Sequence, residues 1–264
     1  AGTLQELLPV LRWDSRKVFI YRVQRPAAAR SPLMQSALAL YDVAIVPHHE
    51  GEAEAPLPDG LRSVWVGPIV IRDKHDALSR EEARLRLGLP PNGTVVYVTY
   101  GGGGDTAMDS ALGVTIEALA HEPFTVAVPY APLYRGEMPR GSALPSNVVI
   151  VRHYPMAEMY SAFDAAISAA GYNTSMELLH HGVPTALVPF PRQVDDQHAR
   201  AADLSACGAA LMIEELSAAN VQAAVGALLD SSRAATMRTA ALKRVPANGA
   251  EAAAGAIVAL WQPQ

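Results

Sequence analysis

From residue 78 onward, short apolar runs alternate with helical patterns, and this alternation limits the fold more than any other feature of the sequence. The runs read VVYVTY, FTVAVP, NVVIV, DAAISAA and PTALVPF. Strands that are apolar on both faces are typical of a parallel sheet lying between two layers of helices. The sequence therefore predicts an α/β fold with a doubly wound parallel sheet of about six strands, whose ligands bind beyond the carboxyl ends of the strands.

Start and stop signals bound the helices between these strands. Ser79 is the expected N-cap of one helix, with Glu82 at the capping-box position, and Gly88 and Pro90 end that helix. The other helical patterns cover 106–120, 157–163, 217–229, 233–243 and 249–261.

Composition and charge exclude several classes of protein. Half of the 264 residues are apolar, which is ample for a sizeable core and typical of a soluble globular protein. The net charge of −5 and the scattered basic residues give no electrostatic signature of a nucleic-acid partner. No apolar run reaches the length of about 18 residues that a transmembrane helix needs. With a single cysteine and no signal peptide, the chain is expected to be cytoplasmic.

The stretch from residue 170 to 210 carries the strongest chemical signal. The strand DAAISAA ends at Gly171, and a helix opening with Asn173 and Thr174 follows, so free backbone N–H groups there can bind an anion. Glu177 lies one helical turn after Thr174, where a carboxylate can accept both hydroxyls of a ribose. The loop after the next strand ends in Asp196 and Gln197, which apolar periodicity does not explain; a solvated helix N-cap is the alternative.

A second chemical feature is the run of four glycines that follows the strand VVYVTY. Gly102, Gly103 and Gly104 can let the backbone approach a ligand and present N–H groups, with the helix dipole starting near Asp105. A flexible strand-to-helix turn is the plainer interpretation. No Gly-Lys-Ser/Thr follows, which excludes a P-loop, and the third glycine of a dinucleotide-binding fingerprint is missing.

Seven short motifs in order make the sequence similar to a known family. They are Gly171-Tyr-Asn-Thr174, Glu177, Gly182-Val-Pro184, Val188-Pro189, Asp196-Gln197, Arg200-Ala201 and Gly208-Ala-Ala210. Together they resemble the donor-binding C-terminal domain of GT-B nucleotide-sugar glycosyltransferases, in particular family 28, which includes the N-acetylglucosaminyltransferases of peptidoglycan synthesis. The resemblance implies that Glu177 binds the ribose and that Asp196 and Gln197 face the hydroxyls of the donor sugar. It also places His153 and Tyr154 at the base and Arg72 near the diphosphate.

The resemblance also implies a domain organisation. Strand patterns at 17–24, 41–47 and 63–72, with one short helical piece at about 33–40, resemble the closing strands of an N-terminal Rossmann-like domain. Three strands and one helix cannot cover both faces of a parallel sheet. We therefore expect residues 1–72 to be a remnant of that acceptor domain with the interdomain crossing, and residues 73–264 to be the donor domain. The missing part would belong to the same polypeptide or to a partner chain.

The reaction implied by the resemblance is inverting, metal-independent transfer of a hexose from a nucleoside-diphosphate sugar, most simply a UDP-sugar. The acceptor, which can be a small molecule, a glycan or a lipid-linked molecule at the inner membrane face, and the catalytic base stay unassigned. No cofactor and no metal are expected, because there is no Asp-x-Asp motif. The adjacent pairs His48-His49 and His180-His181 also lack the i, i+4 spacing of a helical zinc site.

Two alternatives remain open at this point. One is a hydrolase or epimerase acting on a nucleotide sugar, which would need an acid or base near Asp196 or His198. The other is a non-catalytic donor-binding subunit that becomes an enzyme only with a separate acceptor-binding chain.

Overall fold

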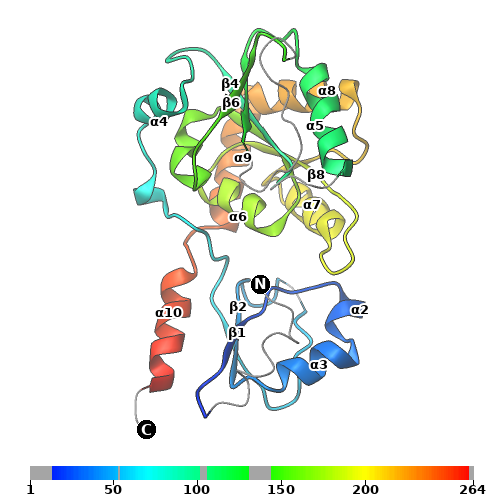
Figure 1. The fold of residues 1–264 in the computed structure, drawn as a ribbon, viewed down its shortest axis with the longest axis vertical. Coiled ribbons are helices and arrows are strands. Elements are labelled where there is room, and N and C mark those ends of the chain that lie inside the picture. The colour runs from blue at the N-terminus through cyan, green and yellow to red at the C-terminus, as the bar shows by residue number, and fades with distance from the viewer. Residues whose placement is uncertain (1–13, 53, 102–105, 131–143, 262–264) are drawn as a thin grey trace. The chain divides into compact units, whose positions relative to one another are not determined.

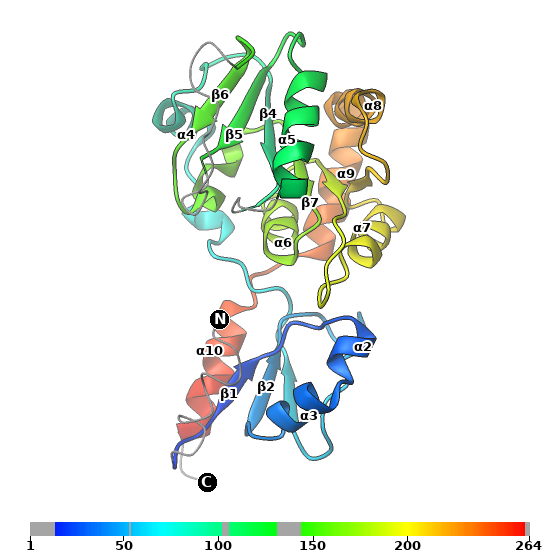
Figure 2. The ribbon, with the colours of Figure 1, turned by 45° about the vertical axis from the view of Figure 1, so that its right-hand side comes forward.

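The computed structural model describes residues 14–52, 54–101, 106–130 and 144–261, and the chain forms two compact units (Figures 1 and 2). The first unit comprises residues 1–69, 192–196 and 247–264, and the second comprises residues 70–191 and 197–246. Each unit is built around its own parallel sheet.

The second unit contains a six-stranded sheet in the order β6-β5-β4-β7-β8-β9. All of its pairings are parallel. The strands are β4 (Val95–Thr99), β5 (Thr125–Pro129), β6 (Val148–Val151), β7 (Ala165–Ala169), β8 (Thr185–Val188) and β9 (Leu211–Met212). The chain builds outward from β4 in one direction and from β7 in the other, so the strand order switches between these two neighbours. The predicted doubly wound parallel sheet is confirmed.

Alternate residues along the strands supply two separate cores. Val96 and Val98 of β4 pack with α5 and α8 on one face, whereas Val95 and Tyr97 pack with α4 and α6 on the other. The helices of this unit are α4 (Arg80–Leu87), α5 (Thr106–Ala118), α6 (Tyr172–His180), α7 (Gln197–Ala206), α8 (Ala218–Leu229) and α9 (Ser231–Arg244). Figure 2 shows α5 and α8 along one side of the sheet. A period of two in the strands thus places one apolar set against each helix layer.

Local sequence signals set several helix ends. Ser79 Oγ accepts the Glu82 N–H at 3.2 Å, and Gly88 ends α4 in a left-handed conformation with φ of 67°. The pattern at 157–163 does not form the expected α-helix but a 3₁₀ helix, η4 (Met156–Ala162). A 3₁₀ helix rises about 2.0 Å per residue, so this short connection between β6 and β7 reaches further than an α-helix of equal length. A second 3₁₀ turn is η2 (Lys74–Asp76).

The first unit contains a three-stranded parallel sheet in the order β1-β2-β3. Its elements are β1 (Val18–Ile20), α2 (Pro26–Ala29), α3 (Pro32–Leu38), β2 (Val43–Val46), β3 (Arg62–Trp65), α10 (Ala250–Val258) and η5 (Ala259–Trp261). The third strand is shorter than predicted. Gly67 follows it with φ of 73°, and a Cβ at this position would lie 2.9 Å from Cε1 of His49. The strand therefore gives way to a turn that only glycine fits.

The last helix completes the first unit. Val43 and Ile45 of β2 pack with Ala253 and Ile257 of α10, while the opposite face of the same sheet packs with α3. The Gly249 N–H donates to the Pro68 carbonyl at 2.8 Å and ties the start of α10 to this unit. We expected α10 in the second domain. It lies with the first sheet because three parallel strands need a cover on both faces.

Candidate functional site

The turn between β7 and α6 lies at the switch in strand order. Gly171 is the N-cap of α6 and no side chain caps this end, so the helix begins at Tyr172, one residue before the predicted Asn173. Asn173 is exposed and Thr174 is half-buried. Backbone N–H groups in the first turn of a helix have no intrahelical partner, and together with the helix dipole they favour an anion.

Arg200 of α7 contacts the backbone just before this turn. Its guanidinium donates a hydrogen bond to the Ala170 carbonyl at 2.7 Å and lies over the Tyr172 ring, 5.4 Å from its centre. Arg200 therefore fixes the backbone on which α6 begins, which gives the Arg200-Ala201 motif a structural reason.

Glu177 lies in the second turn of α6 in a largely buried position. Burial raises the pKa of its carboxyl group to about 7, although hydrogen bonds from the Tyr160 hydroxyl, at 3.3 Å, and from the backbone of Ile71 act in the opposite direction. At neutral pH this carboxyl group is close to its pKa, and its ionised form can accept further hydrogen bonds from a ligand.

Arg72 and His153 meet at a glutamate that the sequence analysis missed. Arg72 Nε donates to Glu158 Oε1 at 2.6 Å, and His153 Nε2 lies 3.2 Å from Glu158 Oε2. The hydrogen bonds from Arg72 and His153 lower the pKa of Glu158. The glutamate thus stays ionised and links the segment after residue 70 to the loop after β6.

Two adjacent histidines close α6 against the same segment. His181 Nε2 lies 3.3 Å from the Arg72 carbonyl, and burial followed by repulsion from His180 lowers the His181 pKa to about 4. His180 Nε2 lies 3.4 Å from Asp73 Oδ1, and its Nδ1 lies 3.3 Å from the Val245 carbonyl. Neither ring is placed with a second carboxylate in a metal-ligand geometry; among the described residues, no group of three or more His, Cys, Asp or Glu side chains could hold a metal ion.

The remaining predicted residues have different surroundings. Asp196 is counted with the first unit, where its carboxylate lies 3.5 Å from Arg25 Nε. Gln197 is 4% exposed, and its amide oxygen accepts the Phe190 N–H at 3.0 Å, closing the loop between β8 and α7. Tyr154 is 75% exposed. Gly102, Gly103 and Gly104 lie outside the described residues.

The structure therefore brings three predicted residues, Arg72, His153 and Glu177, together around the segment that begins at residue 70. Residues that were not predicted lie there as well. Glu158, Tyr160 and His181 were missed by sequence reasoning. Glu158 and Tyr160 sit in the short run MAEMYSA, where a polar group among buried residues was the available signal. Their partners are as far as 86 positions away in sequence, so local patterns could not identify them.

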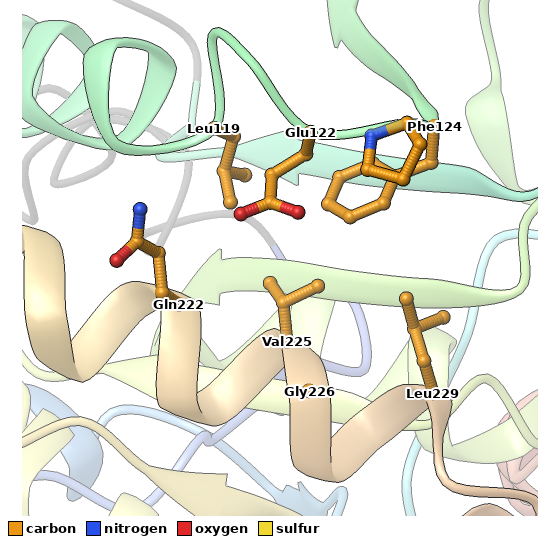
Figure 3. Close-up of a pocket in the computed structure, with 8 residues that line it drawn as sticks. Leu119, Glu122, Phe124, Gln222, Val225, Gly226 and Leu229 are labelled. Carbon is orange, nitrogen blue, oxygen red and sulfur yellow. The ribbon is translucent and has the colours of Figure 1, made fainter.

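A pocket of about 250 Å³ lies elsewhere in this unit, between the turn that precedes β5 and the helix α8 (Figure 3). Leu119 and Phe124 face Val225 and Leu229 across it, with Gln222 at the rim. Because β5 begins at Thr125, this pocket adjoins the amino ends of the strands. It lies at the opposite edge of the sheet from the turn at Gly171 and is separate from the candidate site.

Comparisons with known proteins support the resemblance. Residues 134–253 match the family model described as the glycosyltransferase family 28 C-terminal domain. The UDP-N-acetylglucosamine--N-acetylmuramyl-(pentapeptide) pyrophosphoryl-undecaprenol N-acetylglucosamine transferase of Desulforudis audaxviator is 31% identical over 203 residues, which are 72% of this chain and 54% of the relative. The chain spans about half the length of the curated relatives it matches.

Solved structures show the same fold. The glycotransferase of kitacinnamycin superposes with a TM-score of 0.63 at 17% identity, over 98% of this chain and 67% of that chain. MurG of Acinetobacter baumannii gives a TM-score of 0.50 at 19% identity, over 83% and 60% of the two chains. The resemblance to family 28 and the expected fold class are confirmed. Across the described residues, no helix is long and apolar enough to cross a membrane.

Proposed function

We propose that this chain, which carries a glycosyltransferase family 28 C-terminal domain, is the donor-binding part of a glycosyltransferase that uses a nucleoside-diphosphate sugar. The observation that carries the proposal is the position of Glu177. It lies one turn inside a helix whose start is free of side-chain caps, at the switch in strand order where α/β sheets bind ligands. Anion and diol recognition are thus available about one helical turn apart.

In this proposal, the diphosphate lies at the start of α6 and the ribose at Glu177. The N–H groups near Asn173 and Thr174 and the positive end of the helix dipole would stabilise the charge of the leaving diphosphate without a metal ion. Arg72 and the glycines 102–104 are proposed as further donors to the phosphates. Asp196 and Gln197 are proposed to face the sugar hydroxyls.

The proposed reaction is inverting hexosyl transfer. The acceptor hydroxyl oxygen attacks the anomeric carbon, the bond from that carbon to the diphosphate oxygen breaks, and its electron pair leaves with the nucleoside diphosphate. A general base near the acceptor takes the hydroxyl proton. The relatives' names specify UDP-N-acetylglucosamine as donor and an undecaprenol-linked acceptor, so we propose a UDP-sugar as donor and a lipid-linked molecule at a membrane surface as the first acceptor to test.

Calorimetric titration with UDP, dTDP, GDP and NAD tests the proposal. We expect one nucleoside diphosphate to bind without added metal, and Glu177→Ala to weaken its binding about tenfold or more, the size of one charge-assisted contact. Glu117→Ala is the matched control, because Glu117 is an exposed glutamate near the end of α5 that adjoins the amino edge of the sheet. Binding of no nucleotide, or equal binding by the two variants, would contradict the proposal.

A second measurement separates transfer from the alternative reactions. UDP-N-acetylglucosamine is incubated with the protein without an acceptor, and the products are separated. Release of free sugar or of an isomer would indicate a hydrolase or an epimerase and would contradict a transferase.

A further inference from the structure

The pocket between the turn before β5 and the helix α8 has no role in the proposed function. We call it the α8 pocket. It has a volume of about 250 Å³, and all but two of the residues that line it are apolar or glycine (Figure 3). An apolar cavity of about 150 Å³ is large enough to hold a benzene molecule. The α8 pocket can therefore take one aromatic ring with a short side chain.

The two polar side chains of the α8 pocket, Glu122 and Gln222, both offer hydrogen-bond acceptors. The Gln222 amide nitrogen donates to the Ala118 carbonyl at 2.9 Å, so the amide oxygen remains as an acceptor. Glu122 is half-buried, and its carboxylate points toward α8 (Figure 3). Among the described residues, no basic side chain pairs with this carboxylate. A ligand that matches these groups carries hydrogen-bond donors and a positive charge.

The turn that carries Glu122 is held in place by one side chain. Asn147 Nδ2 donates to three backbone carbonyls, those of Leu119 at 2.8 Å, Glu122 at 3.3 Å and Phe124 at 3.1 Å. These bonds fix the wall of the pocket before any ligand is present. A rigid wall lowers the entropic cost of binding, which matters most for a ligand that makes few contacts.

Gly226 keeps the α8 pocket open on the side of the helix. It lies within α8, where glycine is less favourable than alanine, and a Cβ at this position would meet no atom within 4 Å. Packing therefore does not require glycine here. Because Gly226 lines the pocket together with Val225 and Leu229, a longer side chain at this position would project into the empty space. The pocket can thus be filled without a change to the core.

We propose that the α8 pocket binds a primary ammonium ion that carries an apolar body, such as an arylalkylammonium ion. The apolar body lies against Phe124, Val225 and Leu229, and the ammonium group donates to the Glu122 carboxylate and the Gln222 amide oxygen. A hydrogen bond between two charged groups is stronger than a neutral one, and more so beside an apolar surface. A neutral ligand of the same shape lacks this contact, and an anion is repelled by Glu122.

The test uses three ligands that share a phenyl ring: 2-phenylethylammonium, the neutral 2-phenylethanol of almost the same shape, and the anion 3-phenylpropanoate. Nitrogen-15 NMR titration of the full chain measures both the affinity and the location of binding. We expect the ammonium ion to bind with a Kd of about 1 mM or lower, at least about tenfold more tightly than the alcohol, and the anion to bind most weakly. The amide signals that shift should belong to residues 119–124 and 222–229.

Two variants separate the charge of the pocket from its shape. Glu122→Gln keeps the size of the side chain without the charge, and should bring the affinities for the ammonium ion and the alcohol within about threefold of each other. Gly226→Leu fills the pocket and should weaken binding of the ammonium ion at least about tenfold.

Matched controls make the same two changes on α5. Glu117→Gln and Gly113→Leu alter exposed residues that do not line the pocket, and a Cβ at Gly113 also meets no atom within 4 Å. Both controls should bind the ammonium ion as the unchanged protein does. The melting temperature of each variant checks that it is folded. If Gly226→Leu is not folded, the smaller Gly226→Ala takes its place and should weaken binding less.

Three results would overturn the proposal. They are equal affinity of the unchanged protein for the ammonium ion and the alcohol, a full preference for the ammonium ion in Glu122→Gln, and no shift of the named signals at about 10 mM ammonium ion. None of them concerns nucleotide binding, so this proposal and the proposed function fail separately.

Discussion

Glu158 and Glu177 lie in the same unit, and their pKa values are shifted in opposite directions. Glu158 accepts from Arg72 and His153, and these hydrogen bonds keep its pKa below the usual range. Glu177 is more deeply buried, and its hydrogen-bond partners among the described residues are the Tyr160 hydroxyl and the backbone of Ile71. Burial outweighs them and raises the pKa of Glu177 to about 7. The comparison shows that burial outweighs the hydrogen bonds at Glu177, whereas the hydrogen bonds outweigh burial at Glu158.

The difference between the two glutamates separates a supporting role for Glu158 from the binding role proposed for Glu177. A glutamate whose oxygens are both occupied can position its neighbours but has little left for a ligand. Where ionisation of a glutamate is unfavourable in the free protein, hydrogen bonds from ligand hydroxyls stabilise its ionised form most. Functional sites often carry such a cost in stability.

The largest expected effect is the stability gained by Glu177→Gln. The folded-state pKa of Glu177, about 7, exceeds the ordinary value of 4.5, so its contribution to stability is complete below pH 4.5 and is lost as the pH rises through 7. The neutral variant avoids this loss, and we expect it to be more stable than the unchanged protein by about 3 kcal/mol at about pH 8 and by almost nothing at about pH 4.5. Urea unfolding at both pH values measures the difference.

Glu117→Gln serves as the control for this experiment, since it makes the same change at an exposed position of α5. It should leave the free energy of unfolding nearly unchanged at either pH. If the free energy of unfolding of Glu177→Gln differed from that of the unchanged protein by the same amount at both pH values, the contrast between the two glutamates would be refuted.

The second effect concerns His181, the C-cap residue of α6, four residues after Glu177. Its folded-state pKa of about 4 lies below the ordinary 6.5, so the stability from the neutral ring is present above pH 6.5 and is lost as the pH falls toward 4. His181→Gln cannot take up a proton. The loss of stability between about pH 7.5 and about pH 5 should therefore be about 2 kcal/mol smaller in this variant. If the free energy of unfolding in urea depended on pH in the same way in His181→Gln and in the unchanged protein, the burial of a neutral His181 would be contradicted.

A third effect, about tenfold per pH unit, is expected in ligand affinity. In the proposed site, ribose hydroxyls bind the ionised form of Glu177, so below pH 7 the carboxyl group is expected to release a proton when the ligand binds. The affinity for UDP-N-acetylglucosamine should therefore fall as the pH decreases below 7, and calorimetry in buffers of different ionisation enthalpy should detect the released proton. This ligand has no group that titrates in that range. Glu177→Gln should show a flat profile; a falling one in that variant would assign the effect to another group.

The smallest effect is the contribution of Arg72 and Glu158 to stability. The Arg72 side chain is 40% exposed, and ion pairs of this kind contribute little. In a double-mutant cycle with Arg72→Gln and Glu158→Gln, we expect a coupling energy in unfolding below about 1 kcal/mol. A much larger coupling would show that solvent does not screen this ion pair.

Much of the second unit could be predicted from the sequence. The apolar runs located five of the six strands, Ser79 and Gly88 marked the ends of α4, and Gly171 marked the turn at which α6 begins. These features depend on residues within a few positions of one another. The period of a strand and the chemistry of a cap are local, and a single sequence displays them directly.

Contacts between distant residues could not be predicted in this way. The sequence supplied Arg72, His153 and Glu177 as separate candidates, but only the tertiary structure brought Arg72 and His153 to Glu158 and Glu177 to Tyr160.

The same division holds for the fold as a whole. The sequence by itself determined the class of the fold, because alternating strands and helices with parallel crossovers admit few arrangements. The tertiary structure decided that α10 covers the first sheet, that the pKa of Glu158 is lowered and that the pKa of Glu177 is raised. Packing and pKa depend on which distant groups share a low-dielectric environment, and that follows from the folded chain.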